Sequence, residues 1–395
     1  MKVTALFYCV PFALPVLASN HLLFKIIYDT RPATLKLLSV KKARMSRKTG
    51  IVKDGRYLQH ASSFSHPESP ERLAAVYEML DNPHMSWKYV DIEPRTASDD
   101  EIAYVHTSSY INTIAGTAGQ GCVFLDSDTI ASAESYEIAK LAAGGLMNAI
   151  DGVMTGEVNN AFAFVRPPGH HAGAENSAGF CIFNNVAIGA MHAMKKHGLK
   201  KIMIVDWDLH HGNGTQNIFY SDRRVLYFST HQYPYYPGTG GLHEIGKGKA
   251  LGYTVNVPLR HGAVNGTFIA AFRKILEPIA QAFKPELILV SAGFDIYFQD
   301  PLGSMRVTPE GFAAMARVLL NIADQCCEGR IVAVLEGGYN PVGLARSAKA
   351  TLEEMFDETH YTDKKLDVME QEADEENKPV IQSVITGMRP FWDVF

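Results

Sequence analysis

The stretch KIMIVDWDLHHGNG at residues 201–214 decides the fold of this chain. Its first five residues read as a short strand buried on both faces, and they are followed by carboxylates and imidazoles. A parallel sheet presents its ligands at the carboxyl ends of its strands. Because side chains alternate along an extended segment, Asp206, Asp208 and His210 point to one side. Oxygen and nitrogen donors without thiolate suit a borderline divalent metal such as zinc; a capping Asp and a hydrogen-bonded core His are the simpler alternative.

The bulk composition predicts a large core and excludes some functions. The 395 residues are 47% hydrophobic, and the net charge of −5 gives no general attraction for nucleic acid. No apolar run is long enough to span a bilayer. The five cysteines show no regular spacing, which favours a reducing compartment and predicts a cytoplasmic protein.

Three segments differ in composition. Residues 1–48 carry nine Lys or Arg against one acid, and we interpret them as an N-terminal extension. Residues 1–18 resemble a secretory signal, in which case the protein is exported, whereas Met45 is a natural start for the globular part. Residues 49–357 are predicted to form a single domain, and residues 358–395 are predicted to form an acidic C-terminal tail.

From about Gly50 the chain alternates short apolar runs with helix-length segments. This alternation predicts parallel βαβ units in a three-layer α/β/α fold with a mostly parallel central sheet. The predicted strands are residues 161–165, 201–205, 225–229, 287–291 and 331–335, and the predicted helices include residues 132–154, 183–197, 266–283 and 309–326.

A polar motif follows every predicted strand. Because the carboxyl ends of parallel strands meet at one edge of a sheet, these motifs are expected to converge on one crevice, which we interpret as an active site. The motifs are RPPGHHA (166–172), DWDLHHG (206–212), STH (229–231), SAGFD (291–295) and EGGY (336–339).

Asp208, His210 and Asp295 are the predicted metal ligands. Two carboxylates and one imidazole leave a tetrahedral zinc with an open position, as a catalytic site requires, and a bound water then has its pKa lowered toward neutrality. The alternative for Asp295 is a turn-forming role after Gly293 and Phe294.

His170 and His171 follow a stiff Pro-Pro-Gly segment and are predicted to act on the reacting water. Histidine has the right pKa to take a proton from water and return it to a leaving amine, although two surface-loop histidines are the alternative. Tyr339 follows two glycines, and its phenol can donate to a developing oxyanion. Phe180, after Gly179, and Tyr236 lie in segments rich in Gly and Pro, where they either wall a narrow apolar channel or belong to the core.

With these motifs the chain resembles the zinc-dependent histone deacetylase and acetylpolyamine amidohydrolase family, which has the arginase/deacetylase fold. The resemblance runs from about Gly50 to Met355 and makes residues 49–357 a deacetylase domain. Besides the motifs above, it rests on HPESPERL (66–73), VHTSSYI (105–111) and GFCIFNN (179–185).

The resemblance implies a role for further residues. His171 is expected to be the general base and His170 its electrostatic or acid partner. Asp206 is expected to orient His170 and to bind a structural potassium ion together with Ser229 and backbone carbonyls, including that of Thr230. Asp208 and His210 are expected to supply the other carbonyl ligands. Asn213 is expected to mark the class II branch, and Arg72 is expected to lie near the channel floor.

The expected reaction is hydrolysis of an N-acetyl amide with release of acetate. Leu302 stands where polyamine-selective members carry Glu, which favours acetyl-lysine in a protein or peptide over a small acetylated amine or polyamine. A binuclear ureohydrolase of the same fold and an inactive acyl-lysine-binding scaffold are the rival interpretations. No direct nucleic-acid or membrane partner is expected, and a homo-oligomer is left open.

Overall fold

The computed structural model describes residues 47–61, 65–359 and 361–395. The signal-like segment and the proposed start at Met45 lie outside the described residues. The described part belongs to one compact unit, residues 46–395. Its four cysteines are all free thiols, and none of its helices combines the length and apolar character that crossing a bilayer demands.

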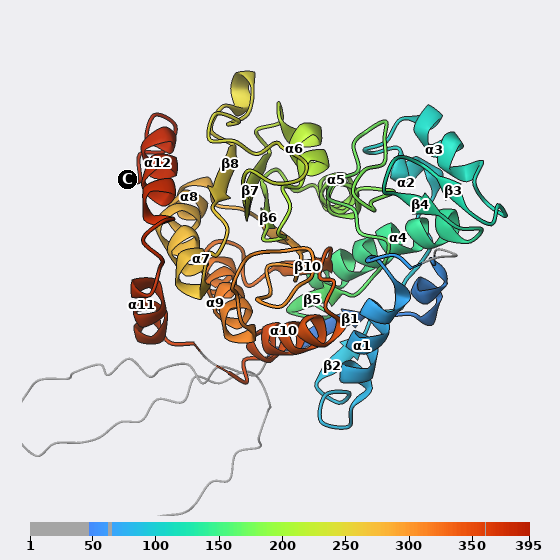
Figure 1. Cartoon of the computed structure of the whole chain (residues 1–395), viewed down its shortest axis with the longest axis horizontal. Helices are drawn as coiled ribbons and strands as arrows, with labels where there is room; N and C mark the ends of the chain where they lie inside the picture. Colours follow the sequence, from blue (N-terminus) through green and yellow to red (C-terminus); the bar gives the residue numbers. More distant parts are fainter. Residues whose placement is uncertain (1–46, 62–64, 360) are drawn as a thin grey trace, which may run out of the picture. The chain divides into compact units, whose positions relative to one another are not determined.

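Eight parallel strands form the central sheet, in the order β2-β1-β5-β10-β9-β6-β7-β8 (Figure 1). The sequence predicted five of them, β5, β6, β7, β9 and β10, to within a few residues. The strands are β1 (Thr49–Val52), β2 (Tyr89–Asp91), β5 (Asn160–Ala163), β6 (Ile202–Asp206), β7 (Val225–Gln232), β8 (Thr254–Leu259), β9 (Leu287–Ala292) and β10 (Ile331–Leu335). A separate antiparallel pair consists of β3 (Val123–Phe124) and β4 (Ile130–Ala131).

Helices flank the sheet and complete the predicted α/β/α architecture (Figure 1). The long helix α4 packs on β1, β5 and β10, and α9 packs on β10 and α10. The helices are α1 (Pro70–Asp81), α2 (Asp99–Ile102), α3 (Ser108–Ala115), α4 (Ser135–Met154), α5 (Asn185–His197), α6 (Asn213–Phe219), α7 (Asn265–Ala271), α8 (Glu277–Phe283), α9 (Pro309–Cys326), α10 (Pro341–Met355), α11 (Asp363–Gln371) and α12 (Lys378–Met388), with short turns η1 (Gly55–Gln59), η2 (Gly248–Ala250) and η3 (Phe272–Leu276).

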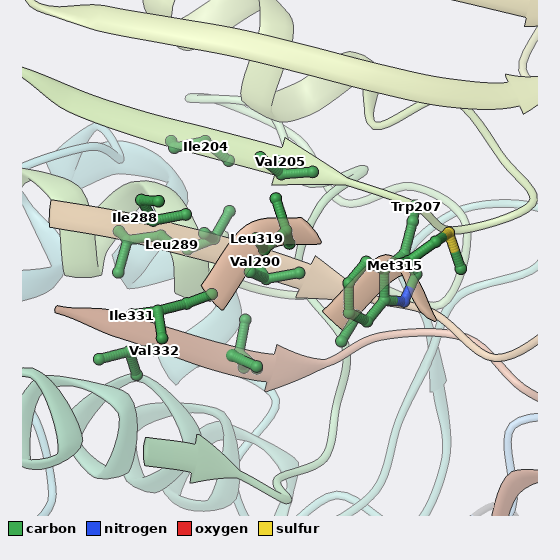
Figure 2. Close-up of a cluster of buried hydrophobic side chains, with 14 of the residues drawn as sticks. Ile204, Val205, Trp207, Ile288, Leu289, Val290, Met315, Leu319, Ile331 and Val332 are labelled. Atoms are coloured by element: carbon green, nitrogen blue, oxygen red, sulfur yellow. The ribbon is translucent and has the colours of Figure 1, made fainter. Parts of the chain in front are cut away.

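The core lies where the central strands meet α9 (Figure 2). Every residue of β6, β9 and β10 is buried, because helices cover both faces of the sheet. Figure 2 shows Leu319 of α9 beside Val290 of β9, and Met315, one turn away on α9, beside Trp207. Each fully buried side chain of this kind contributes about 1.5–3 kcal/mol to folding, so the strand ends that carry the polar motifs stand on a rigid base.

The segment that was predicted to be an acidic tail forms α11 and α12. Helix α11 packs on α7, and α12 packs on β8, the last strand of the sheet. Ile381, Val384 and Met388 share one face of α12 and are buried. Beyond α12, the indole of Trp392 donates a 2.8 Å hydrogen bond to the carbonyl of Gly252. This segment is therefore not a tail: its acidic residues belong to amphipathic helices, and α12 covers the edge strand β8 of the sheet.

Candidate active site

The sheet brings the polar motifs to one edge. Strand β6 lies between β9 and β7, and its last residue, Asp206, is in register with Ser291 of β9 and Ser229 of β7. The loops that follow β6 and β9 therefore meet at the same edge. They place Asp208 and Asp295 together, although 87 positions separate the two residues in the sequence.

Asp208, His210 and Asp295 form one small cluster. Nδ1 of His210 lies 3.2 Å from Oδ1 of Asp208 and 3.1 Å from Oδ2 of Asp295. The two carboxylates are fully buried, and the histidine is nearly so. A Cβ atom at Gly293 or Gly337 would collide with the carboxylate of Asp208, so the backbone approaches the cluster only because both residues are glycine.

The charges of this cluster favour a divalent cation. Burial and the neighbouring carboxylate of Asp208 raise the pKa of Asp295 to about 7. Burial alone would also raise the pKa of Asp208, but His170 and His210 hold it well below its usual range. Two carboxylates that share one small buried volume repel each other, and a divalent cation would neutralise both. Two oxygens and one imidazole nitrogen are donors that zinc accepts.

His170 and His171 lie beside the cluster with different partners. Their ring centroids are 4.0 Å apart, and both side chains are 3% exposed. Nδ1 of His170 lies 3.1 Å from Oδ2 of Asp206, whereas Nδ1 of His171 lies 2.8 Å from Oδ1 of Asn213. The pair is therefore buried and held, which rules out the surface-loop alternative.

The two partners separate the pKa values of the histidines. Burial would lower the pKa of His170, but the carboxylates of Asp208 and Asp206 raise it to about 10. Burial and the nearby His170 and His210 lower the pKa of His171 well below the ordinary histidine value. One imidazole is thus favoured as a cation and its neighbour as a neutral base.

Glu336 holds the histidine loop in place, a role that the sequence analysis missed. Its Oε2 accepts hydrogen bonds from the backbone N–H groups of Gly169, at 2.7 Å, and His170, at 3.2 Å. Its Oε1 accepts from the hydroxyl of Ser291 at 3.0 Å. The strand end after β10 is thereby connected to the loops after β5 and β9. An acidic residue directly after a buried strand was the available signal.

Tyr339 lies over the predicted channel floor. The guanidinium of Arg72 is 4.7 Å from the ring centroid of Tyr339, and its Nε donates to the carbonyl of Gly338 at 2.6 Å. The backbone N–H of Tyr339 donates to Oδ2 of Asp300 at 2.6 Å, and Oδ1 of Asp300 accepts from the N–H of Leu302 at 3.0 Å. Asp300, which the sequence analysis did not single out, therefore anchors both residues.

Aromatic rings gather around the histidine pair. Phe180 has a positive φ of 69° and lies edge-on to Tyr339, with centroids 5.8 Å apart. A Cβ atom at Gly179 would collide with the ring of His171. The ring centroids of Tyr236 and His171 are 5.2 Å apart, and Tyr236 is 41% exposed. Tyr236 therefore lines the wall of the site and is not a core aromatic.

Tyr235 is a further wall residue that the sequence analysis missed. Its ring stacks on His210, with centroids 5.7 Å apart, and its hydroxyl donates to the carbonyl of Leu302 at 2.8 Å. Leu302 therefore belongs to the same wall as Tyr235 and Tyr236. The structure thus gathers all the predicted channel residues around one site.

The residues predicted to bind potassium lie beneath the histidine pair. Asp206, Ser229 and Thr230 are fully buried; Asp206 ends β6, and Ser229 and Thr230 lie in the second half of β7. Oδ1 of Asp206 accepts from the N–H of Asp208 at 3.2 Å, so the carboxylate faces the loop that carries Asp208 and His210. The potassium ligand predicted at Thr230 is its backbone carbonyl. Its side-chain Oγ1 is buried without a hydrogen-bond partner among the described residues, but it lies on the opposite face of β7 from the side chain of Ser229, because side chains alternate along a strand. A set of buried oxygens at two adjacent strand ends fits a monovalent cation.

Comparisons with known proteins agree with this geometry. The histone deacetylase domain matches residues 66–355 of this chain. A probable deacetylase of Archaeoglobus fulgidus is 45% identical over 297 residues, which cover 75% of this chain and 82% of that protein. The polyamine deacetylase HDAC10 of Homo sapiens is 42% identical over 301 residues, 73% of this chain but only 44% of that protein. The crystal structure of the HDA15 HD domain superposes with a TM-score of 0.81 at 36% identity, covering 88% of this chain and 95% of the other.

Proposed function

Because this chain belongs to the histone deacetylase family and is a hydrolase of amide bonds, we propose that it is a zinc-dependent deacetylase of Nε-acetyl-lysine in proteins or peptides. One observation carries the proposal: the cluster of Asp208, His210 and Asp295 faces a pair of histidines with opposite electrostatic environments. Zinc held by these three residues would polarise a carbonyl and acidify a water molecule.

His171 is the proposed general base. Oδ1 of Asn213 is an acceptor, so Nδ1 of His171 donates its proton to it and Nε2 keeps a free lone pair. Nε2 takes a proton from water as the water oxygen attacks the acetyl carbon. The same proton passes to the amine nitrogen when the C–N bond breaks, which releases acetate and the free amine. His170, held as a cation by Asp206, supplies positive charge beside the reacting atoms.

Tyr339 is the proposed oxyanion donor. Its phenol keeps its proton, because burial raises its pKa well above the ordinary tyrosine value. As the water attacks, negative charge moves onto the acetyl oxygen, and a phenol held in place by Asp300 and Arg72 can donate a hydrogen bond to it. Removing such a donor typically costs about 10²–10³ in turnover.

The aromatic and apolar residues around the site favour a substrate with an uncharged aliphatic chain next to its acetyl amide. The ring of Tyr236 lies edge-on to His171 and that of Phe180 lies edge-on to Tyr339, and Leu302, whose carbonyl bonds to Tyr235, is an apolar residue beside them. Such walls suit the methylene chain of acetyl-lysine. An acetylated polyamine is the second candidate, because one relative is a polyamine deacetylase. Leu302 offers no charge to a cationic polyamine, and the nearby carboxylate of Asp300 is already bonded to three backbone N–H groups.

A monovalent cation, which we propose to be potassium, would bind at the side chains of Asp206 and Ser229 together with the backbone carbonyls of Asp208, His210 and Thr230. It would supply a fixed positive charge under the loop that carries the metal ligands.

A substrate panel with metal analysis tests the proposal. Zinc-loaded protein is expected to release acetate from acetyl-lysine peptides with a higher kcat/KM than from monoacetylated polyamines. His171→Ala is the control for contaminating activity and is expected to be nearly inactive. Leu302→Glu is expected to shift the ratio toward the polyamine. A protein that binds the peptide without releasing acetate would instead be an acyl-lysine-binding protein.

A further inference from the structure

Two buried histidines outside the proposed reaction lie behind the aromatic wall. His211 and His231 are 1% and 0% exposed, and their ring centroids are 4.7 Å apart. His211 follows the metal ligand His210, and His231 follows the proposed cation ligand Thr230. Both therefore lie between the ion sites and the loop that carries Tyr235 and Tyr236.

The hydrogen bonds of His231 define its tautomer. Nε2 lies 3.0 Å from the carbonyl oxygen of Gly240, which can only accept, so Nε2 carries a proton. Nδ1 lies 2.9 Å from the hydroxyl oxygen of Ser229. Neither described partner is a carboxylate, and a fully buried imidazole with no anion beside it is neutral. Nδ1 is therefore an acceptor, and the hydroxyl of Ser229 donates to it.

This arrangement commits the only hydroxyl proton of Ser229. Because the O–H group points at Nδ1 of His231, the lone pairs of the serine oxygen are left for another partner. Ser229 is in register with Asp206 at the end of β6, where the proposed cation site lies. A serine that donates away from a cation and presents its lone pairs is a suitable ligand, whereas a hydroxyl proton that points at the cation would be repelled.

The second ring nitrogen of His231, Nε2, bonds to the loop that carries Tyr235 and Tyr236. Gly240 has a φ of +88°, and a Cβ atom there would collide with the rings of His231 and His211. Its N–H and that of Gly241 donate to Oε1 of Glu244, at 2.8 and 2.9 Å. The neighbouring Thr239 bonds through its hydroxyl to Nδ1 of His211 at 2.7 Å. The loop is thus fastened at three successive residues, and the first of these lies three positions after Tyr236.

We propose that His231 is a positioning residue that connects the cation site to the substrate wall. Through Nδ1 it directs the oxygen of Ser229 toward the cation, and through Nε2 it fastens Gly240 and so keeps Tyr236 against His171. The inference rests on the proposed function for the meaning of the wall, but the connection itself is a property of the fold. It predicts that the two contacts can be removed separately.

Two substitutions separate the two contacts. In His231→Gln, the side-chain amide reaches the position of Nε2 and can still donate to Gly240, but nothing replaces the acceptor for Ser229. In His231→Asn, the side-chain oxygen occupies the position of Nδ1 and can accept from Ser229, but the contact with Gly240 is lost. His192→Gln, a buried histidine on α5 away from the site, is the matched control.

The cation is assayed by the melting temperature of the full-length protein as KCl replaces NaCl at constant ionic strength. The wall is assayed by the KM for an acetyl-lysine peptide. His231→Gln is expected to need about 10-fold more potassium for half-maximal stabilisation, as the weakening of one ligand would cause, with little change in KM. His231→Asn is expected to raise KM several-fold with an unchanged potassium midpoint. The His192→Gln control is expected to change neither.

The inference is wrong if both His231 variants titrate with potassium as the wild type does, or if wild-type protein is stabilised equally by both salts. Failure of the proposed function is distinct, because it would appear as a wild type that hydrolyses no acetyl amide while its melting temperature still responds to potassium. In that case the wall is assayed by peptide binding. If the His231 variants do not fold, Ser229→Ala tests the cation contact, because it removes the hydroxyl that donates to Nδ1 of His231. An unchanged potassium midpoint in Ser229→Ala would then overturn the inference.

Discussion

Two clusters in this protein contain the same kinds of residue and have different characters. Both combine carboxylate oxygens with imidazole nitrogens closely enough to hold a metal ion. The strand-end cluster consists of Asp208, His210 and Asp295, and the helix cluster consists of Asp151 on α4 with His192 and His197 on α5.

The helix cluster is a closed set of ion pairs. Oδ1 of Asp151 lies 2.8 Å from Nε2 of His192 and 2.7 Å from Nε2 of His197, and Oδ2 lies 2.7 Å from Nζ of Lys196. Burial alone would raise the pKa of Asp151, but these three partners hold it well below its usual range. One carboxylate with three donors has no need of a cation.

The strand-end cluster has the opposite balance. Two carboxylates share one imidazole, at distances of 3.1 and 3.2 Å, and the pKa of Asp295 is raised to about 7. The contrast teaches that residue types alone do not identify a metal site. We expect the ratio of acceptors to donors to distinguish the two clusters, together with their position. Asp151 and His197 precede β5 and β6, at the edge of the sheet away from the strands' carboxyl ends.

The largest expected effect is the loss of zinc from the strand-end cluster. Asp208→Asn is expected to reduce bound zinc from about one per chain to nearly none and kcat/KM by about 10³-fold or more, because one of three ligands is removed. Asp151→Asn, the same change in the helix cluster, is expected to keep both. Metal analysis and acetate release measure these outcomes. Equal zinc loss in both variants would show that the two clusters do not differ in this way.

The next effect is confined to turnover. Tyr339→Phe is expected to lower kcat about 10²–10³-fold with little change in KM or zinc content, because the phenol acts only as charge develops on the acetyl oxygen. Tyr136→Phe removes a phenol that bonds to Asp99 outside the site, and it is expected to leave kcat unchanged. If the Tyr339→Phe enzyme keeps the wild-type kcat, the phenol does not stabilise the oxyanion.

The same contrast explains what could be predicted from the sequence. The strand-end cluster was predictable because β6 and β9 are apolar runs that end abruptly in polar residues, and parallel strands bring those ends together. Strands β1, β2 and β8 were missed, because TGIV and YVD are short and TVNVPL is interrupted by Asn and Pro. Asp300 and Glu336 accept from backbone N–H groups 39 and 167 positions away in the chain. The place of Glu336 directly after a buried strand was a signal for a role, but side-chain patterns do not reveal which backbone groups such residues bond.

A smaller effect on stability is expected from the helix cluster. Asp151→Asn is expected to lower the free energy of unfolding by about 2 kcal/mol at neutral pH, because the charge-assisted bonds to His192, His197 and Lys196 are weakened. Since the folded-state pKa of Asp151 is depressed, its contribution is present above its unfolded pKa, near 3.8, and is lost as the pH falls toward the folded value. The difference from wild type should therefore shrink below about pH 4 in urea unfolding measurements. A difference that stays constant down to about pH 2.5 would assign the effect to packing.

The smallest expected effect is weak zinc binding gained by the helix cluster. It tests most directly whether the balance of carboxylates and positive charges decides which cluster binds a metal. Lys196→Met removes the ammonium group from Oδ2 of Asp151 and leaves one carboxylate with two imidazoles, a donor set that a divalent cation accepts. Equilibrium dialysis of the variant is expected to show a second, weaker zinc ion per chain, with kcat unchanged because the cluster lies away from the active site. If the variant still binds only one zinc ion, then the closer spacing of the donor atoms in the helix cluster, rather than its charge, is what excludes the metal.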